Sequence, residues 1–138
     1  AKMSIEICSN IRGKNIDKAI EHLEADQEMK RPIVVRRFNW DLGHKPGYGP
    51  GRYPINAVKV FIQLLKLAKA NAENKGLNSE KLVISFAKAD FGQRRGHHGR
   101  HRGKMKSTHV EIHVKEMELK EKKASKKTKS EKKVEEKK

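Results

Sequence analysis

The stretch from Arg94 to Arg102 holds the densest group of side chains that could do chemistry, with three histidines and four arginines in nine residues. The ring nitrogens of His97, His98 and His101 could bind zinc, with a fourth ligand from His109 or water. Zinc sites usually use cysteine or carboxylate ligands on a rigid support, however, and the neighbouring arginines would repel a dication. Histidines set between arginines are better suited to stack on bases or to donate to phosphates. We therefore expect no metal here, and a histidine-metal nuclease is the alternative from the class of enzymes.

The wider segment from Asp90 to Lys106 contains four glycines and almost no apolar side chain, so it cannot join a core. Its positive charges would repel one another unless anions surrounded them, and structured RNA supplies anions on several sides. If flanking strands continue into it as a ribbon, it would project roughly 25 Å from the domain. We predict a protruding basic arm whose RNA-contacting residues are Arg94, Arg95, His97, His98, Arg100, His101, Arg102, Lys104 and Lys106.

A second basic segment, from Lys30 to Tyr53, alternates cationic and aromatic residues. Cations can neutralise phosphates, aromatic rings can stack on unpaired bases, and glycines let the backbone approach closely. Its second half, Gly43 to Pro54, has four glycines and three prolines and predicts no regular element. The alternative is a solvated loop whose aromatic rings cover one end of the core, with Trp40 the most core-like. The predicted RNA-contacting residues, together with Lys14, are Lys30, Arg31, Arg36, Arg37, Trp40, His44, Lys45, Tyr48, Arg52 and Tyr53.

No enzyme motif accompanies these segments. The sequence lacks a phosphate-cradling glycine loop with Lys-Ser or Lys-Thr, paired buried carboxylates, and a nucleophile beside a base. We therefore expect neither catalysis nor a cofactor. The net charge of +16 in 138 residues implies a polyanionic partner, and nucleic acid is the first choice.

The apolar runs, the N-terminal residues and the cysteine content of the sequence indicate the compartment of the protein. No apolar run approaches about 18 residues and no signal-peptide pattern opens the chain, so we expect a cytoplasmic protein without membrane contact. The single cysteine, Cys8, excludes an internal disulfide. It recurs at helical spacing with Ile5 and Ile11, which indicates a small buried hydrophobic residue rather than a nucleophile.

The longest helical pattern, Pro54 to Lys75, must support both basic segments. An apolar stripe recurs at three- and four-residue steps, Pro54 suits the start of the helix, and Gly76 suits the position just past its end. Further apolar residues off the stripe predict burial on more than one side. The stripe is Val58, Phe61, Leu65, Ala68 and Ala72, and the residues off it are Val60, Ile62 and Leu67.

Two short helices and two strands complete the predicted fold. Gly13 should stop a first helix around Ile5 to Ile11, and Asn15 should cap a second whose last apolar residue is Leu23. Period-two patterns predict strands Leu82 to Ala87 and Thr108 to Val114. Leu82, Ile84 and Phe86 should share one face of the first strand, and His109 and His113 should be exposed on the second. We predict an α+β domain, residues 1–119, of three helices on a small antiparallel sheet with a long β-hairpin, and a disordered lysine-rich tail, residues 120–138.

Four blocks of sequence resemble a known family. They are IRGKNIDKAIEHLE (Ile11 to Glu24), KRPIVVRRFNWDLGHKPGYGPGRYP (Lys30 to Pro54), ANAENKGLN (Ala70 to Asn78), and HGR with STHVEIHV (His98 to Arg100, Ser107 to Val114). In order and spacing they are similar to the universal large-subunit ribosomal protein L-twenty-two family in its archaeal form, counted as L-seventeen in eukaryotes. The resemblance covers nearly everything before the tail.

The resemblance implies a non-enzymatic structural constituent of the large ribosomal subunit that binds ribosomal RNA. Its hairpin, Ala87 to Thr108, would line the polypeptide exit tunnel, and Gln27 to Tyr53 would be the archaeal-type insertion. The implied partners are ribosomal RNA, neighbouring ribosomal proteins and the nascent polypeptide, without homo-oligomers; a free nucleic-acid chaperone is the alternative. The family also has a strand before its first helix, whereas this sequence starts at Ala1, close to that helix. The implied hairpin tip is Gln93, Arg94, Arg95, Gly96, His97, His98, Gly99 and Arg100.

Overall fold

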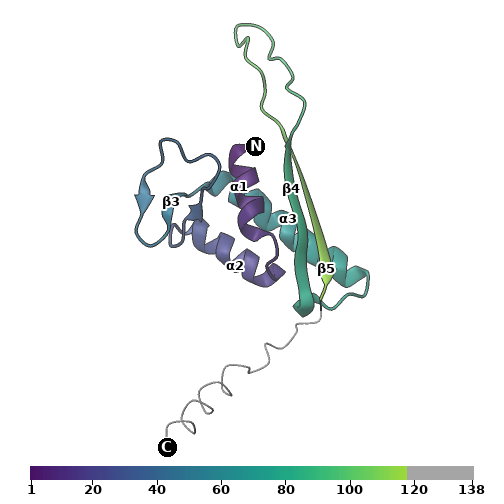
Figure 1. The fold of residues 1–138 in the computed structure, drawn as a ribbon. Helices are drawn as coiled ribbons and strands as arrows, with labels where there is room; N and C mark the ends of the chain where they lie inside the picture. Colours follow the sequence, from purple (N-terminus) through teal and green to yellow (C-terminus); the bar gives the residue numbers. More distant parts are fainter. Residues whose placement is uncertain (118–138) are drawn as a thin grey trace, which may run out of the picture.

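The computed structural model describes residues 1–117, drawn in colour in Figure 1. The chain forms helices α1 (Lys2–Ile11), α2 (Ile16–Gln27) and α3 (Ile55–Asn74), with short strands and one long β-hairpin. This confirms the predicted α+β class. The predicted tail, residues 120–138, lies outside the described residues. No helix within residues 1–117 is long and apolar enough to cross a membrane.

The helices begin and end where the sequence predicts. Gly13 follows α1 with φ +76°, a value that favours glycine. Asn15 caps α2, because its side-chain oxygen accepts a hydrogen bond of 2.9 Å from the Asp17 N–H. Pro54 occupies the N-cap position of α3, and Gly76, with φ +77°, follows the C-cap.

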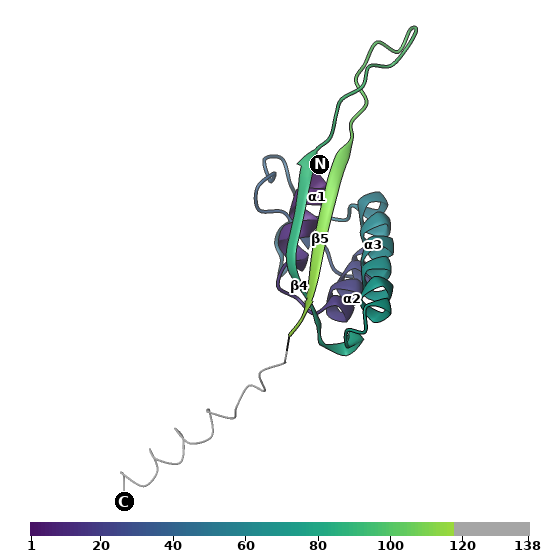
Figure 2. The same ribbon diagram turned by 90° about the vertical axis from the view of Figure 1, so that its right-hand side faces the viewer.

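The core lies between the three helices and one face of the long hairpin (Figure 2). Cys8 is buried as predicted, and burial raises the pKa of its thiol to about 11, so it is an unreactive thiol. The largest fully buried apolar side chains are Ile7, Ile11, Ile16, Leu23, Ile33, Leu65, Leu82 and Ile84.

Helix α3 buries a single stripe, so the prediction of burial on more than one side is wrong. Of the three residues off the stripe only Ile62 is buried, whereas Val60 is 59% and Leu67 58% exposed. The helix packs against α2 and β5 through one face and leaves the remainder open to solvent. Apolar residues beside a helical stripe therefore overstate how much of the helix is covered.

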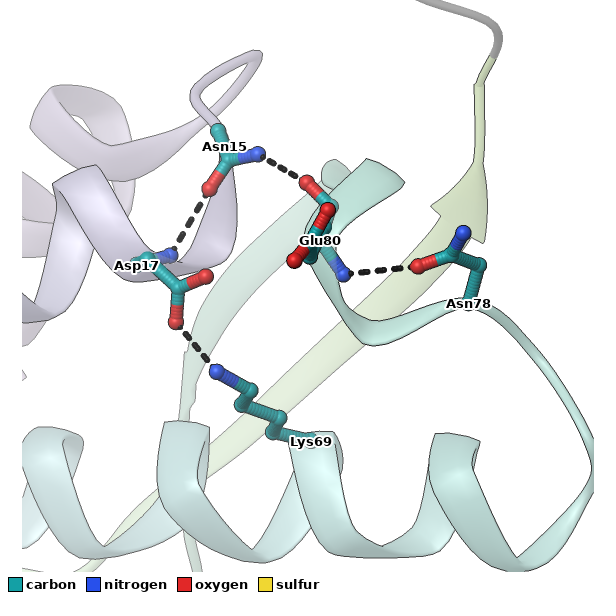
Figure 3. Close-up of polar contacts among 5 residues, drawn as sticks. All are labelled: Asn15, Asp17, Lys69, Asn78 and Glu80. Carbon is teal, nitrogen blue, oxygen red and sulfur yellow. Dashed lines mark hydrogen bonds and ion pairs between the residues drawn. The ribbon is translucent and has the colours of Figure 1, made fainter.

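A polar joint ties the ends of α2 and α3 to the short turn η1 (Ser79–Lys81) that precedes the hairpin (Figure 3). The Asn15 amide donates to the Glu80 carbonyl at 2.9 Å, and the Lys69 ammonium donates to Asp17 at 2.6 Å. The Asn78 side chain accepts from the Glu80 N–H at 3.1 Å. The joint therefore fixes where the hairpin starts relative to two helices.

The hairpin pairs β4 (Leu82–Phe91) with β5 (Thr108–Glu116) in antiparallel register. A bulge between Ile84 and Phe86 reverses the alternation, so Phe86 is exposed while Ala87 is buried. The prediction that Phe86 shares the buried face of Leu82 is therefore wrong, because one extra residue moves every later side chain to the other face. On β5, His109 and His113 are exposed as predicted.

A second small sheet contradicts the prediction that Gly43 to Pro54 lacks regular structure. Strands β1 (Ile33–Val34), β3 (Gly49–Arg52) and β2 (His44–Lys45) pair antiparallel in that order. The Tyr48 N–H donates to the Lys45 carbonyl at 3.0 Å across a turn whose third residue, Gly47, has φ +75°. A Cβ on Gly51 would lie 3.1 Å from the Pro32 Cβ, so a larger residue there would have to displace Pro32 by a few tenths of an ångström.

The hairpin ladder stops at Phe91 and Thr108, and the residues beyond it, 92–107, project away from the helices (Figures 1 and 2). We call this segment the arm. The predicted arm protrudes, although Asp90 belongs to β4 instead. Backbone hydrogen bonds join the two sides of the arm only at intervals, between Gly92 and Ser107, Arg95 and Met105, and His97 and Gly103.

Candidate nucleic-acid interface

Two separate projections carry most of the predicted contact residues, and Lys14, Lys30 and Arg31 lie outside them, at the two ends of α2. One is the basic loop, residues 35–53, which includes β2 and β3 and lies beside α1. The other is the arm, beyond the end of β4 (Figure 1). Side chains of α1 and α2 bind the backbone at the start of the basic loop, whereas the backbone of the arm forms hydrogen bonds across the arm itself.

A buried carboxylate on α1 holds the start of the basic loop. Glu6 is 2% exposed, and its Oε1 accepts from the N–H groups of Arg37 at 2.7 Å and Phe38 at 3.0 Å. Its Oε2 accepts from the Arg36 N–H at 3.1 Å. One helical turn later, the Asn10 amide donates to the Val34 carbonyl at 2.9 Å. The backbone of the loop is therefore fixed to α1 by side chains that the sequence did not single out.

A second buried carboxylate, Asp26 on α2, accepts from the Ile33 N–H at 3.2 Å. Burial raises the pKa of Asp26 to about 6, and this hydrogen bond opposes the rise. The pKa of His22, one turn earlier, is lowered to about 4, mainly by burial and to a smaller extent by the charges of Lys14 and Arg31. Two predicted contact residues thus lie near one buried imidazole.

The loop presents cations and aromatic rings to solvent. Arg36, Arg37 and Arg52 are exposed, and the Lys45 ammonium lies 5.5 Å from the ring centroid of Tyr53. Trp40 is 91% exposed, so the interpretation of Trp40 as a core residue is wrong. Along the chain it lies between the residues that Glu6 binds and β2. The other predicted residues here, His44 and Tyr48, are exposed, and Tyr53 is half-buried.

The arginines keep their charge available. Across residues 1–117, ion pairs involve lysines and one histidine, and no arginine guanidinium lies within 4.0 Å of a carboxylate. Lys30, by contrast, pairs with Glu28 at 2.6 Å. Arg12, outside the predicted set, donates to the Ala87 carbonyl at 2.7 Å and so has a structural partner.

The side chains of the arm are exposed from Gln93 to Ser107. Its turn lies at Gly99 and Arg100, at the end of the implied tip. Within residues 1–117, no three His, Cys, Asp or Glu side chains come together where they could hold a metal ion. Arg94 and Lys106, at the root of the arm, also line a pocket with the N-terminal end of α1. The predicted contact residues of the arm lie along its ribbon. They are Arg94, Arg95, His97, His98, Arg100, His101, Arg102, Lys104 and Lys106.

Several further residues were missed. Phe91, at the root of the arm, is 61% exposed and lies 5.6 Å below the Arg94 guanidinium, and the bulge places Phe86 5.1 Å from the His113 ring. Alternation alone could not reveal them, since it assigns aromatic strand residues to a core. Glu6 gave one weak signal, a carboxylate between Ile5 and Ile7 on an apolar helix. Its partners are backbone N–H groups, which carry no sequence signature.

One family and several archaeal proteins are similar to this chain. The family described as ribosomal protein L22p/L17e matches residues 1–115. The large ribosomal subunit protein uL22 of Methanocaldococcus jannaschii is 45% identical over 94 residues, 66% of this chain and 60% of that protein. The uL22 protein of Thermoplasma volcanium is 41% identical over 92 residues, 67% and 62% of the two chains. That of Thermofilum pendens is 38% identical over 124 residues, 85% and 82%. The matched region is thus about three-fifths of the first two relatives.

Proposed function

Because this chain belongs to the ribosomal protein L22p/L17e family, we propose that it is a structural, RNA-binding component of the large ribosomal subunit. The observation that carries the proposal is the set of exposed arginines on the basic loop and the arm, none of whose guanidinium groups lies within 4.0 Å of a carboxylate in residues 1–117. Cations without protein partners need anions, and ribosomal RNA supplies them. Residues 1–119 would form the RNA-binding domain.

The basic loop would bind RNA through two kinds of contact. Arg36, Arg37 and Arg52 would neutralise phosphates, which gives affinity that falls with salt. Trp40 and Tyr48, both exposed, would stack on unpaired bases. Such a combination suits folded RNA with splayed nucleotides better than a uniform duplex.

The arm would line the polypeptide exit tunnel. Support comes from its projection beyond the helices and from its exposed side chains, which are mostly polar and leave only Met105 as an apolar contact for a passing chain. Its arginines would hold it between RNA segments while its turn faces the nascent polypeptide. Neighbouring ribosomal proteins would complete the surroundings of the domain.

The loop proposal is tested by replacing Arg36, Arg37, Lys45 and Arg52 with alanine and measuring binding to large-subunit RNA at several salt concentrations. We expect the slope of the logarithm of the binding constant against the logarithm of the salt concentration, the log–log slope, to fall in magnitude by roughly one unit for each phosphate that the variant no longer neutralises. A control that removes the same number of charges replaces the exposed lysines Lys18, Lys59, Lys75 and Lys81. An unchanged slope in the loop variant would contradict the proposal.

The tunnel proposal is tested by replacing Gly92 to Gly103 with an Asn-Gly turn and determining a map of subunits that contain the shortened chain. We expect the subunit to assemble with one part of the tunnel wall open. A wall identical to that of the wild type would contradict the proposal. Co-sedimentation with large subunits through high salt separates this role from that of a free nucleic-acid chaperone.

A further inference from the structure

We propose that Glu6 is a positioning residue for RNA: its buried carboxylate fixes the backbone of residues 36–38 so that Arg36 and Arg37 are held as a ready-made pair for phosphates. This inference rests on the proposed function of the basic loop. Glu6 itself would touch no RNA, since it is 2% exposed.

The geometry of the contact is that of an anion in a backbone cradle. Three successive N–H groups, those of Arg36, Arg37 and Phe38, converge on the two carboxylate oxygens at 3.1, 2.7 and 3.0 Å. Successive N–H groups that point to one side form a concave site for an anion. In this chain the site is filled from within, so an RNA phosphate cannot occupy it.

In this contact the backbone N–H groups bind the Glu6 carboxylate, and the arginine side chains do not. A buried carboxylate beside two arginines would be expected to form ion pairs, because a buried charge needs a partner. In residues 1–117 no guanidinium lies within 4.0 Å of a carboxylate, and charge-assisted hydrogen bonds from the backbone satisfy Glu6 instead. Arg36 and Arg37 are both exposed, so their guanidinium groups stay available.

Neighbouring contacts extend the fixed stretch on its N-terminal side. Asn10, one turn after Glu6 on α1, holds the Val34 carbonyl at 2.9 Å. The Val35 N–H donates to the Pro50 carbonyl on β3 at 2.9 Å. Residues 34–38 are therefore bound to both a helix and a strand before any RNA arrives. Preorganisation of this kind strengthens binding because less ordering remains to be done in the complex.

The test compares Glu6→Gln, Arg36→Ala/Arg37→Ala and the triple variant in binding to large-subunit RNA across a salt series, at a temperature where thermal melts show every variant folded. Glutamine keeps the size of the side chain but places an amide N–H₂ where one oxygen accepted. We expect Glu6→Gln to lower the log–log slope by roughly two units, as the double arginine variant does, and the triple variant to lower it no further. Ile7→Val, a neighbouring core change on α1, controls for reduced stability and should keep the wild-type slope.

Each outcome separates the role of Glu6 from that of the loop. A wild-type slope in Glu6→Gln, or reductions that add in the triple variant, would overturn the positioning role while leaving the loop proposal intact. A wild-type slope in the double arginine variant would overturn both. Should Glu6→Gln fail to fold, Glu6→Asp keeps the charge and shortens its reach. We expect weaker binding that is non-additive with the arginine changes, and additive reductions would again overturn the positioning role.

Discussion

The basic loop and the arm both carry several exposed cations but are held in opposite ways. Two buried carboxylates, Glu6 and Asp26, anchor the backbone around the start of the loop to α1 and α2. The arm has backbone contacts only across itself, and its side chains from Gln93 onward are exposed. Charge composition is therefore a poor guide to order. What distinguishes the two is whether backbone N–H groups find acceptors in the body of the domain.

The largest difference should appear in amide hydrogen exchange of the free protein. We expect the Arg37 and Phe38 amides to exchange roughly a thousand-fold more slowly than those of the arm, because opening the Glu6 contact leaves a buried carboxylate without its hydrogen-bond donors. Exchange followed by NMR measures both regions in one sample. Slow exchange throughout the arm would remove the distinction between the two.

Charge removal in the arm should change RNA binding strongly and folding hardly at all. Replacing Arg94, Arg95, Arg100 and Arg102 with alanine should lower the log–log salt slope by roughly four units, if each arginine meets one phosphate. The melting temperature should stay that of the wild type, since no arginine of the arm has a carboxylate partner in residues 1–117. A lower melting temperature would show that the arm is part of the folded core.

The anchor at Asp26 should be visible in the pH dependence of stability. Between pH 4 and 6 the folded state keeps a proton on Asp26 that the unfolded chain has released, so this group alone lowers stability as pH rises. His22 does the reverse, since the unfolded chain holds its proton in that window and the folded state does not. Each effect is worth roughly 3 kcal/mol and they oppose one another.

We therefore expect the wild type to change little in stability from pH 4 to 6.5. Asp26→Asn should gain stability as pH rises, through His22 alone, and His22→Gln should lose it, through Asp26 alone. Urea unfolding at steps of half a pH unit measures all three. Parallel curves for the three proteins would show that neither group titrates in this range.

The smallest effect should come from deleting most of the arm. Replacing Gly92 to Gly103 with Asn-Gly removes almost no buried apolar area, and β4 and β5 can still pair through a short turn. We expect the free energy of unfolding to stay within about 0.5 kcal/mol of the wild type. A decrease of several times that amount, measured by urea unfolding, would contradict the view that the arm contributes nothing to the core.

The sequence predicts what depends on local pattern. Apolar spacing and capping residues located the helices, including Asn15 and Gly76, and the lack of apolar residues identified the arm. Pro46 and Gly47 form a Pro-Gly pair, which favours a turn, but the many glycines and prolines around it concealed two strands. Phe86 was misplaced because a bulge has no periodic signature.

The missed part of the site depends on contacts between distant residues. Glu6 binds backbone groups about thirty positions away, and any residue type except proline could supply those N–H groups. Sequence reasoning can find the side chains that face RNA because their types are informative. It cannot find the groups that hold such a surface in place when their partners are the backbone.

The polar joint of Figure 3 fixes the hairpin at one end, so that it behaves as a beam held at its base, a cantilever. Its fixed end lies near Leu82, where the Asn15 amide donates to the Glu80 carbonyl in the preceding turn. The Ile84 N–H donates to the Lys14 carbonyl, and the Ile84 carbonyl accepts from the Gly13 N–H. The helices support it as far as Ala89, which is buried, and beyond Phe91 the side chains are exposed from Gln93 to Ser107. A sideways load on the tip, such as a chain pulled past it, would bend the beam where that support ends. Under such a load we expect the largest bending where Gly92 and Ser107 pair, and the hydrophobic core would not be deformed.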